Sequence, residues 1–260
     1  MQLSRSFQPF EKKILDSKAP SIQIEATPTE HITISTSKFG GNPYLPKGEK
    51  LPQDQKAKNM LLLAQLNFGE IPDLEGYPAQ GILQFFIGGK GYGCDFSNPT
   101  QQKNFCVRYY PSLADNYQTD FGDYTPSNDP MINPLAGGVY QLSFSVGEEY
   151  VPSSDVQFKK FMGDTVECFF ENNFGETMYD TWDEYDQIIP RSKGHKMGGY
   201  ADFTQDDPRR GGFEDYILLL QIDSTKGISW GDAGIGNFFI HPQDLANLDF
   251  SKVLYNWDCH

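Results

Sequence analysis

The chain has few of the residues that stabilise extracellular or metal-dependent proteins. Its 260 residues include only four cysteines and four histidines, and no two cysteines form a C-x-x-C pair. This scarcity excludes a disulfide framework and a histidine-rich metal site, so we expect neither a metal nor a cofactor. No stretch approaches the ~20 apolar residues of a membrane span, and no signal-peptide pattern is present. These absences predict a cytoplasmic protein with reduced thiols.

Basic residues are scarce as well. The chain has 21 Lys and Arg against 35 Asp and Glu, which gives a net charge of -14. Residues 1–130 carry 12 basic and 14 acidic side chains, whereas residues 131–260 carry 9 and 21, so the second half alone holds -12. Binding to DNA, RNA or an anionic membrane needs clustered cations, so we exclude these partners. The charge favours a basic protein as the partner.

The established motifs of nucleotide binding and nucleophilic catalysis are missing. Gly89–Gly93 resembles the start of a dinucleotide-binding turn, but Cys94 replaces the third glycine and no helix pattern follows. We interpret this stretch as a flexible turn. Residues 120–122 spell the magnesium-binding D-F-G triplet of kinases without the catalytic loop that accompanies it. The sequence therefore assigns no catalytic residue, and it favours a protein that is not an enzyme.

Three short strings recur in the same order in the two halves of the chain. Each copy lies 153 to 158 residues after its counterpart, and the last pair shares five of seven residues as G-I-x-x-F-F-I. The pairs are Lys38–Gly41 with Lys196–Gly199, Leu61–Leu66 with Ile217–Ile222, and Gly81–Ile87 with Gly234–Ile240. Chance rarely keeps three motifs collinear, so the pattern predicts an internal duplication.

The repeats also predict how the chain is divided. Residues 1–110 form an N-terminal half with the first repeat, and residues 141–260 form an acidic C-terminal half with the second. Residues 111–140 are rich in Asp, Asn, Pro and Gly, which is typical of a connecting loop. We expect the two halves to pack as one globular unit.

The repeated strings have the pattern of strands. Leu61–Leu66 and Ile217–Ile222 are apolar runs of strand length bounded by polar residues. Residues 22–24 and 32–34 alternate with period two around a turn-forming stretch, which predicts a hairpin. Helical patterns are short, at residues 10–15, 156–162, 181–185 and 242–245. The predicted fold class is α+β, strand-rich, with two similar halves, a mostly antiparallel sheet and a few short helices.

Two glutamines occupy the same place in the repeated apolar runs. Gln65 and Gln221 each put an amide among residues that we expect to be buried. A buried amide must find partners or cost ~1–3 kcal/mol of stability. We therefore interpret these side chains as centres of matched internal hydrogen-bond networks rather than as ligand contacts.

A cleft between the two halves is one candidate site. The histidine at 195 stands beside the second Gly-Gly turn, where its near-neutral pKa suits a general base or a ligand contact. A ring that only fixes the turn is the simpler alternative, and Ser37 occupies the equivalent place in the first half. Acids, a guanidinium and an aromatic side chain follow in the second half. The candidate cleft residues are His195, Asp207, Arg209, Trp230 and Asp232.

An acidic, aromatic segment is the second candidate site. Residues 161–190 contain eight Asp and Glu and no Lys or Arg, and aromatic residues are interleaved with the acids. This composition suits an anchor for a basic protein, with charge for steering and rings for affinity. A solvated helix face whose rings point to the core is the alternative. The candidate partner contacts are Tyr179, Trp182, Asp183, Glu184 and Asp186.

Seven strings follow one another along the chain: KFGGNPYLP, LLLAQLNF, GILQFF, GHKMGGYADFTQDDPR, LLLQIDS, WGDAGIGNFFI and DFSKVLYNWDC. In this order they resemble the bacterial YwqG family, whose function is unknown, and the resemblance covers roughly Phe39 to the C-terminus. The resemblance implies an α+β chain of two similar strand-rich halves and implies no reaction. Relatives have been proposed as immunity proteins, which neutralise bacterial toxins.

Three hypotheses follow from the sequence. The first is a protein-binding module, of the immunity type, that uses the segment 161–190 against a basic partner. The second is a small-ligand binder or an unrecognised enzyme that uses the cleft between the halves. The third is a purely structural domain.

Overall fold

The computed structural model describes residues 3–260, and its strands form one sheet. The strand order is β10-β9-β8-β7-β1-β6-β2-β3-β4-β5, and every pair is antiparallel. The strands are β1 Ala19–Pro28, β2 Lys38–Phe39, β3 Leu61–Asn67, β4 Ile82–Ile87, β5 Phe105–Tyr110, β6 Tyr140–Glu149, β7 His195–Gly198, β8 Ile217–Asp223, β9 Ile235–Ile240 and β10 Leu254–Asp258. The predicted α+β class with a mostly antiparallel sheet is confirmed.

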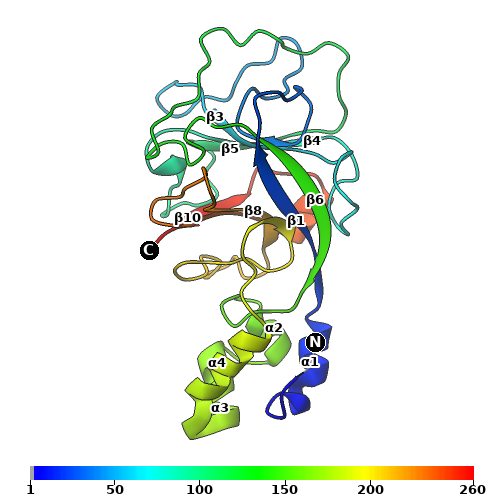
Figure 1. Ribbon diagram of the computed structural model, residues 1–260, viewed down its shortest axis with the longest axis vertical. Coiled ribbons are helices and arrows are strands. Elements are labelled where there is room, and N and C mark those ends of the chain that lie inside the picture. The colour runs from blue at the N-terminus through cyan, green and yellow to red at the C-terminus, as the bar shows by residue number, and fades with distance from the viewer. Residues whose placement is uncertain (1–2) are drawn as a thin grey trace.

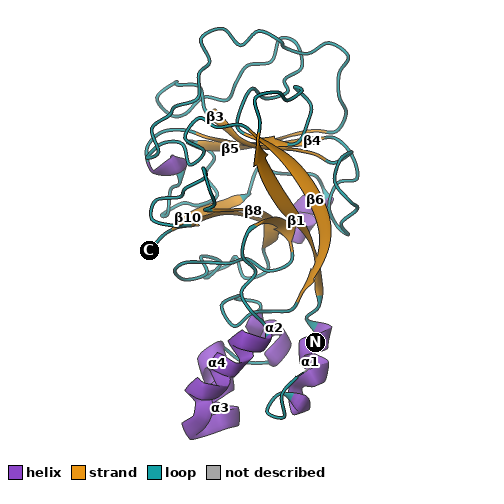
Figure 2. Ribbon diagram, in the orientation of Figure 1, coloured by secondary structure: helices purple, strands orange, loops and turns teal. Residues whose placement is uncertain are grey.

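The helices are short, and four of them lie together at one end of the molecule (Figure 2). They are α1 Glu11–Asp16, α2 Phe158–Met162, α3 Val166–Phe174, α4 Met178–Ile188 and α5 Pro242–Ala246, with 3-10 turns η1 Gln8–Phe10, η2 Gly91–Gly93 and η3 Gly175–Thr177. The four predicted helical patterns fall on α1, α2, α4 and α5, whereas α3 was not predicted. Among residues 3–260 the longest helix, α4, has 11 residues, and no helix is long and apolar enough to cross a membrane.

The predicted hairpin between residues 22–24 and 32–34 is wrong. Strand β1 pairs along its whole length with β6, from Ala19 opposite Glu149 to Pro28 opposite Tyr140. The segment after β1 cannot form a ladder because side chains occupy its carbonyl groups. The carbonyl of Ile34 accepts hydrogen bonds from the Lys38 ammonium at 2.9 Å and from the Gln65 amide at 2.8 Å.

The two halves exchange strands at the centre of the sheet. Each half contributes one long strand, β1 or β6, and one short strand, β2 or β7, that begins its own repeat. The long strand of each half pairs with the short strand of the other, β1 with β7 and β6 with β2. One continuous sheet therefore includes both halves, and each half completes the other's ladder.

The sheet folds over so that its two ends face each other (Figure 1). Strands β2–β5 form one layer and β7–β10 the other, and the long β1 and β6 connect them. The ring of Phe85 lies 4.8 Å from that of Phe238, and the ring of Phe105 lies 5.2 Å from that of Tyr255, measured between centroids. The main apolar core lies between the two layers because each layer turns its aromatic face inward.

A buried amide network fixes the first layer. The Nε2 atom of Gln65 donates to the carbonyls of Ile34 and Thr36 at 2.8 and 2.9 Å. Its Oε1 atom accepts from the Tyr44 N–H and from the Gln84 amide, both at 2.8 Å. This side chain is fully buried, and all of its hydrogen-bonding groups are satisfied within the protein.

The same network recurs in the second layer. The Nε2 atom of Gln221 donates to the carbonyls of Ser192 and Gly194 at 3.0 and 2.8 Å, and its Oε1 atom accepts from the Asp202 N–H at 2.8 Å. The neighbouring amide of Asn237, which corresponds to Gln84, donates to the Asp202 carbonyl at 2.9 Å. The internal role predicted for the two glutamines is confirmed, since both are used to hold loops against the sheet.

We predict that Gln65→Leu and Gln221→Leu each lower the free energy of unfolding by at least about 2 kcal/mol, because each change leaves buried backbone groups without partners. Urea denaturation measures the loss. Gln141→Leu, on the exposed face of β6, is the matched control and should change stability by less than about 0.5 kcal/mol. Equal effects at all three positions would contradict the network interpretation.

Candidate functional site

The acidic segment folds into a helical arm, by which we mean residues 158–188 with α2, α3, η3 and α4. Its rings turn inward: Phe169, Phe170 and Tyr185 are at most 2% exposed and form a second core with Phe7 of the N-terminal segment. The Trp182 ring stacks on Phe170, with centroids 5.3 Å apart and an interplanar angle of 4°. The aromatic residues therefore hold the arm together.

Five of the eight acids of the arm are exposed to solvent. They are Glu167, Glu171, Glu176, Asp180 and Asp183. Of the five predicted partner contacts, Asp183 is exposed and Tyr179 is 72% exposed, whereas Glu184 is half-buried. Trp182 is held by Phe170, and Asp186 accepts a hydrogen bond from the Ser153 hydroxyl. Burial raises the pKa of Asp186, and the Ser153 hydroxyl opposes that rise.

A cleft of about 580 Å³ lies at the base of the arm. One wall comes from the arm and includes Phe158 and Trp182, and the other comes from residues 205–214. The carboxylate residues that line the cleft are Asp155, Glu167, Asp206, Asp207 and Glu214, and the cationic ones are Lys159 and Arg210. The cleft thus carries a net negative charge beside an aromatic ring.

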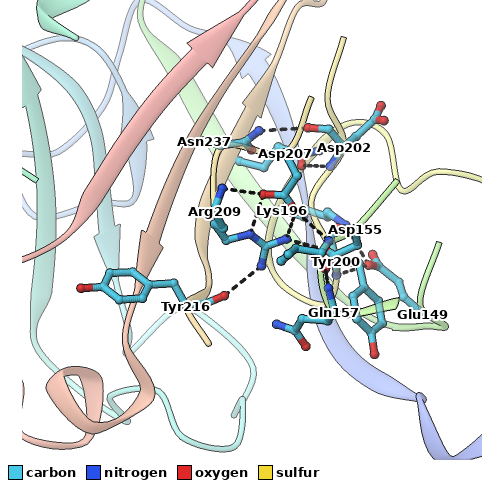
Figure 3. Close-up of polar contacts among 12 residues, drawn as sticks. Glu149, Asp155, Gln157, Lys196, Tyr200, Asp202, Asp207, Arg209, Tyr216 and Asn237 are labelled. Carbon is cyan, nitrogen blue, oxygen red and sulfur yellow. Dashed lines mark hydrogen bonds and ion pairs between the residues drawn. The ribbon is translucent and has the colours of Figure 1, made fainter. Parts of the chain in front are cut away.

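A buried ion cluster forms the floor of this cleft (Figure 3). The Arg209 guanidinium donates to both carboxylate oxygens of Asp207, at 3.0 and 2.7 Å, and to Asp155 at 2.7 Å. It also donates to the Tyr216 carbonyl at 2.8 Å and lies 4.6 Å from the centre of the Phe239 ring. Burial raises the pKa of Asp155, and Arg209 and a backbone N–H oppose that rise. The cluster fixes the loop after β7 against the start of the arm.

A second buried pair lies next to this cluster (Figure 3). The Lys196 ammonium on β7 donates to the Glu149 carboxylate at the end of β6 at 2.7 Å, and also to the Tyr200 carbonyl. The same Glu149 oxygen accepts from the Tyr200 N–H at 2.9 Å. Burial lowers the pKa of Lys196, whereas Glu149 favours its charged form. The Glu149 carboxylate at the end of β6 therefore holds both β7 and the loop after it.

The five residues predicted for a cleft between the halves do not line one cleft. Asp207 lines the cleft at the base of the arm, with Arg209 buried beneath it. Trp230 is fully buried against Tyr92, and only Asp232 is exposed. The structure brings Asp207 and Arg209 together and leaves the other three elsewhere.

Both ring nitrogens of His195 contact other residues of the fold. Its Nδ1 atom accepts from the Asp223 N–H at 3.0 Å, its Nε2 atom lies 3.2 Å from the Thr225 hydroxyl, and its ring packs on Phe39. Burial lowers the pKa of His195 to about 4, although Asp223 favours its charged form. In the first half the Ser37 hydroxyl accepts the corresponding backbone N–H, that of Asn67, at 2.9 Å. The simpler alternative, a ring that fixes the turn, accounts for all of these contacts.

Most of the chain matches one protein family. A family model described as a domain of unknown function, DUF1963, matches residues 37–259. The chain belongs to this family. Comparison with curated proteins finds no significant match. The DUF1963 match extends from β2 to β10 and includes every residue of the cleft, but it excludes β1, although β1 lies in the middle of the sheet.

Sequence reasoning missed three members of the buried clusters. The sequence assigned no role to Asp155 or Glu149, and Lys196 stood out only as part of a repeated string. A signal was available for the lysine, because the repeated K-x-G-G string places Lys38 and Lys196 at the same position of the two repeats. No local signal marks Glu149 or Asp155, since their partners lie 47 and 54 residues away in the chain.

We predict that Arg209→Met lowers the free energy of unfolding by about 3–5 kcal/mol, because two buried carboxylates then lack their cation. Arg210→Met is the matched control. This neighbouring arginine is exposed, so its loss should change stability by less than about 0.5 kcal/mol. Chemical denaturation at neutral pH measures both variants, and a similar small effect for the two would contradict a structural role for the cluster.

The pKa of His195 gives a second prediction. Because that pKa is about 4 in the folded protein and 6.5 when unperturbed, the unfolded state binds the proton more tightly. The stability that His195 contributes is complete above pH ~6.5 and falls as the pH drops, by about 2 kcal/mol between pH 7 and 5.

The variant His195→Ser should lose this part of the pH dependence and keep an acceptor for the Asp223 N–H. Urea denaturation at several pH values measures the difference from the unsubstituted protein. His31→Ser, at an exposed histidine, is the control. An unchanged pH profile in His195→Ser would show that the imidazole is not the titrating group.

Proposed function

We propose that this protein binds a basic protein through the acidic face of its helical arm and the cleft at the base of the arm. The observation that carries the proposal is the cleft itself, a space of about 580 Å³ lined by Trp182. Its exposed acids are Glu167, Asp206 and Glu214, and its exposed cations are Lys159 and Arg210. Below them Arg209 pairs with both Asp155 and Asp207, so the cleft with its floor has five carboxylates and three cations. A cleft of this volume is large enough for one or two side chains of a partner. The net negative charge of the cleft favours a lysine or arginine side chain of the partner.

The chemistry of the cleft suits a cationic side chain in two ways. A guanidinium or ammonium that enters it can pair with Asp206 or Glu167, which are exposed at its walls. Trp182 presents an aromatic ring to the same space, and a cation close to a ring face gains about 0.5–2 kcal/mol. Ser154 also lines the cleft, and its hydroxyl is buried without a partner among residues 3–260.

The charge around the cleft supports steering of a basic partner. Residues 131–260 hold 21 acidic and 9 basic side chains, and the arm exposes its acids in one continuous segment. A field of one sign raises the rate of encounter with an oppositely charged protein and is screened by salt. Tyr179, which is 72% exposed on α4, adds a ring that a partner can cover.

We infer a narrower family and a role from the resemblance of the sequence to the YwqG family. The seven collinear strings support a YwqG-type protein, and an immunity-type role in which the partner is a basic toxin accords with the acidic arm. An internal duplication is supported by the repeated strings together with the matched contacts of Gln65 and Gln221.

The test compares three forms of the protein as bait in its source organism's lysate, at low and at high salt, with mass spectrometry of the retained proteins. The arm variant carries Glu176→Lys, Asp180→Lys and Asp183→Lys. The matched control carries Glu30→Lys, Asp73→Lys and Glu75→Lys, three exposed acids in the first half. Both variants change the net charge equally, and circular dichroism checks that both remain folded.

We expect one basic protein to remain bound to the unsubstituted protein and to the control at low salt, and to dissociate at high salt. Calorimetry with that purified partner should give an affinity at least about tenfold weaker for the arm variant. Equal retention by all three forms, retention that ignores salt, or no retained protein would refute the proposal.

A further inference from the structure

A second cleft lies in the first half, away from the helical arm. It has a volume of about 420 Å³ and lies between the 54–59 turn, the turn after β4 and the loop at 123–127. The helical arm occupies the opposite end of the molecule from the loops that join β5 to β6 (Figure 1). Nothing in the proposed protein-binding role uses this cleft.

The glycine turn that follows β4 forms one wall. Gly88 approaches the 54–60 segment so closely that a Cβ at this position would lie 3.0 Å from the Met60 side chain. At Gly89 the φ angle is +80°, and the space around its Cα is open. The N–H groups of Gly89 and Lys90 have no acceptor among residues 3–260. Backbone N–H groups in a glycine turn that have no partner within the protein are donors available to an anion.

Three lysines surround the same space. Lys56, Lys58 and Lys90 are exposed, line the cleft, and form no ion pair within the part of the chain that the structure describes. Two carboxylates also line it. That of Asp54 is buried and accepts the N–H groups of Lys56 and Lys58 at 2.8 and 2.9 Å, so it shapes the turn, and that of Asp123 is exposed. The balance is positive in a protein whose net charge is -14.

The rest of the lining is apolar or aromatic. Leu61 and Ile87, which face each other on β3 and β4, contribute apolar surface together with Ile132. The Tyr124 hydroxyl accepts the Leu62 N–H at 2.9 Å, at the point where the β3–β4 register shifts. This bond attaches the 123–127 loop to the sheet, so the cleft is shaped by the fold rather than by a loose loop.

We propose that this cleft binds a small organic phosphate whose body is apolar or aromatic. The phosphate would lie against the Gly89 and Lys90 N–H groups and the three ammonium groups, and the body would cover Leu61 and Ile132. Lysines and backbone N–H groups are the usual donors to phosphate in proteins, and a dianion gains more from three cations than a monoanion does. The volume of about 420 Å³ suits a molecule of one or two rings.

The probes are phenyl phosphate, inorganic phosphate, benzoate and benzyl alcohol. Inorganic phosphate lacks the ring, benzoate has a carboxylate in place of the phosphate, and benzyl alcohol has the ring without a charge. The cleft variant carries Lys56→Gln, Lys58→Gln and Lys90→Gln. The matched control carries Lys193→Gln, Lys226→Gln and Lys252→Gln, three exposed lysines of the second half, so both variants have the same net charge. Amide chemical shifts by NMR and calorimetry measure binding to the full chain.

We expect phenyl phosphate to shift the Gly89 and Lys90 amides in the unsubstituted protein and in the control, and to bind the cleft variant at least about tenfold more weakly. Inorganic phosphate and benzoate should bind more weakly than phenyl phosphate, and benzyl alcohol should not bind. Equal binding to the two lysine variants, shifts confined to other residues, or no binding at millimolar concentration would overturn the proposal. Benzoate that binds as tightly as phenyl phosphate would overturn the choice of phosphate.

Discussion

The pairing of β1 with β6 is the constraint on which the rest of the structure depends. These two long strands share ten residue pairs, and each also pairs with the short strand of the opposite half. Every other strand is added outward from this centre, four on one side and four on the other. Because the two long strands belong to different halves, neither half completes its own sheet. The fold of the sheet onto itself then buries the aromatic faces of both outer layers in one core.

Buried polar groups decide how the loops lie on this sheet. The amides of Gln65 and Gln221 hold the chain that precedes β2 and β7, so the two Gly-Gly turns are fixed in the same manner. The buried lysines of the two halves have different partners. Lys38 donates to two backbone carbonyls, whereas Lys196 forms an ion pair with Glu149. Burial lowers the pKa of Lys38 to about 8, although Glu70 favours its charged form. A further ion pair of the second half, between Arg209 and Asp155, connects the loop after β7 to the start of the helical arm.

The two halves consequently present surfaces of opposite character. In the second half Arg209 neutralises part of the buried charge, and the remaining carboxylates surround a cleft beneath an acidic arm. In the first half a glycine turn and three lysines, which form no ion pair within residues 3–260, line a smaller cleft. A basic protein and a small phosphate would therefore bind at separate places, by charges of opposite sign. The net charge is -2 in residues 1–130 and -12 in residues 131–260, so most of the negative charge lies in the half that carries the arm.

The sequence by itself determined the strands of the repeated strings, most helices, the repeated amides and the acidity of residues 161–190, because period, length and composition are local properties. It could not determine which strands pair, since β1 has the local pattern of a hairpin strand while its partners lie more than a hundred residues later. Tertiary structure alone placed Trp182 and Asp186 inward, buried His195 and Trp230, and brought Asp155 to Arg209. Burial and long-range charge pairing depend on which surfaces meet, and no local pattern of residues records that.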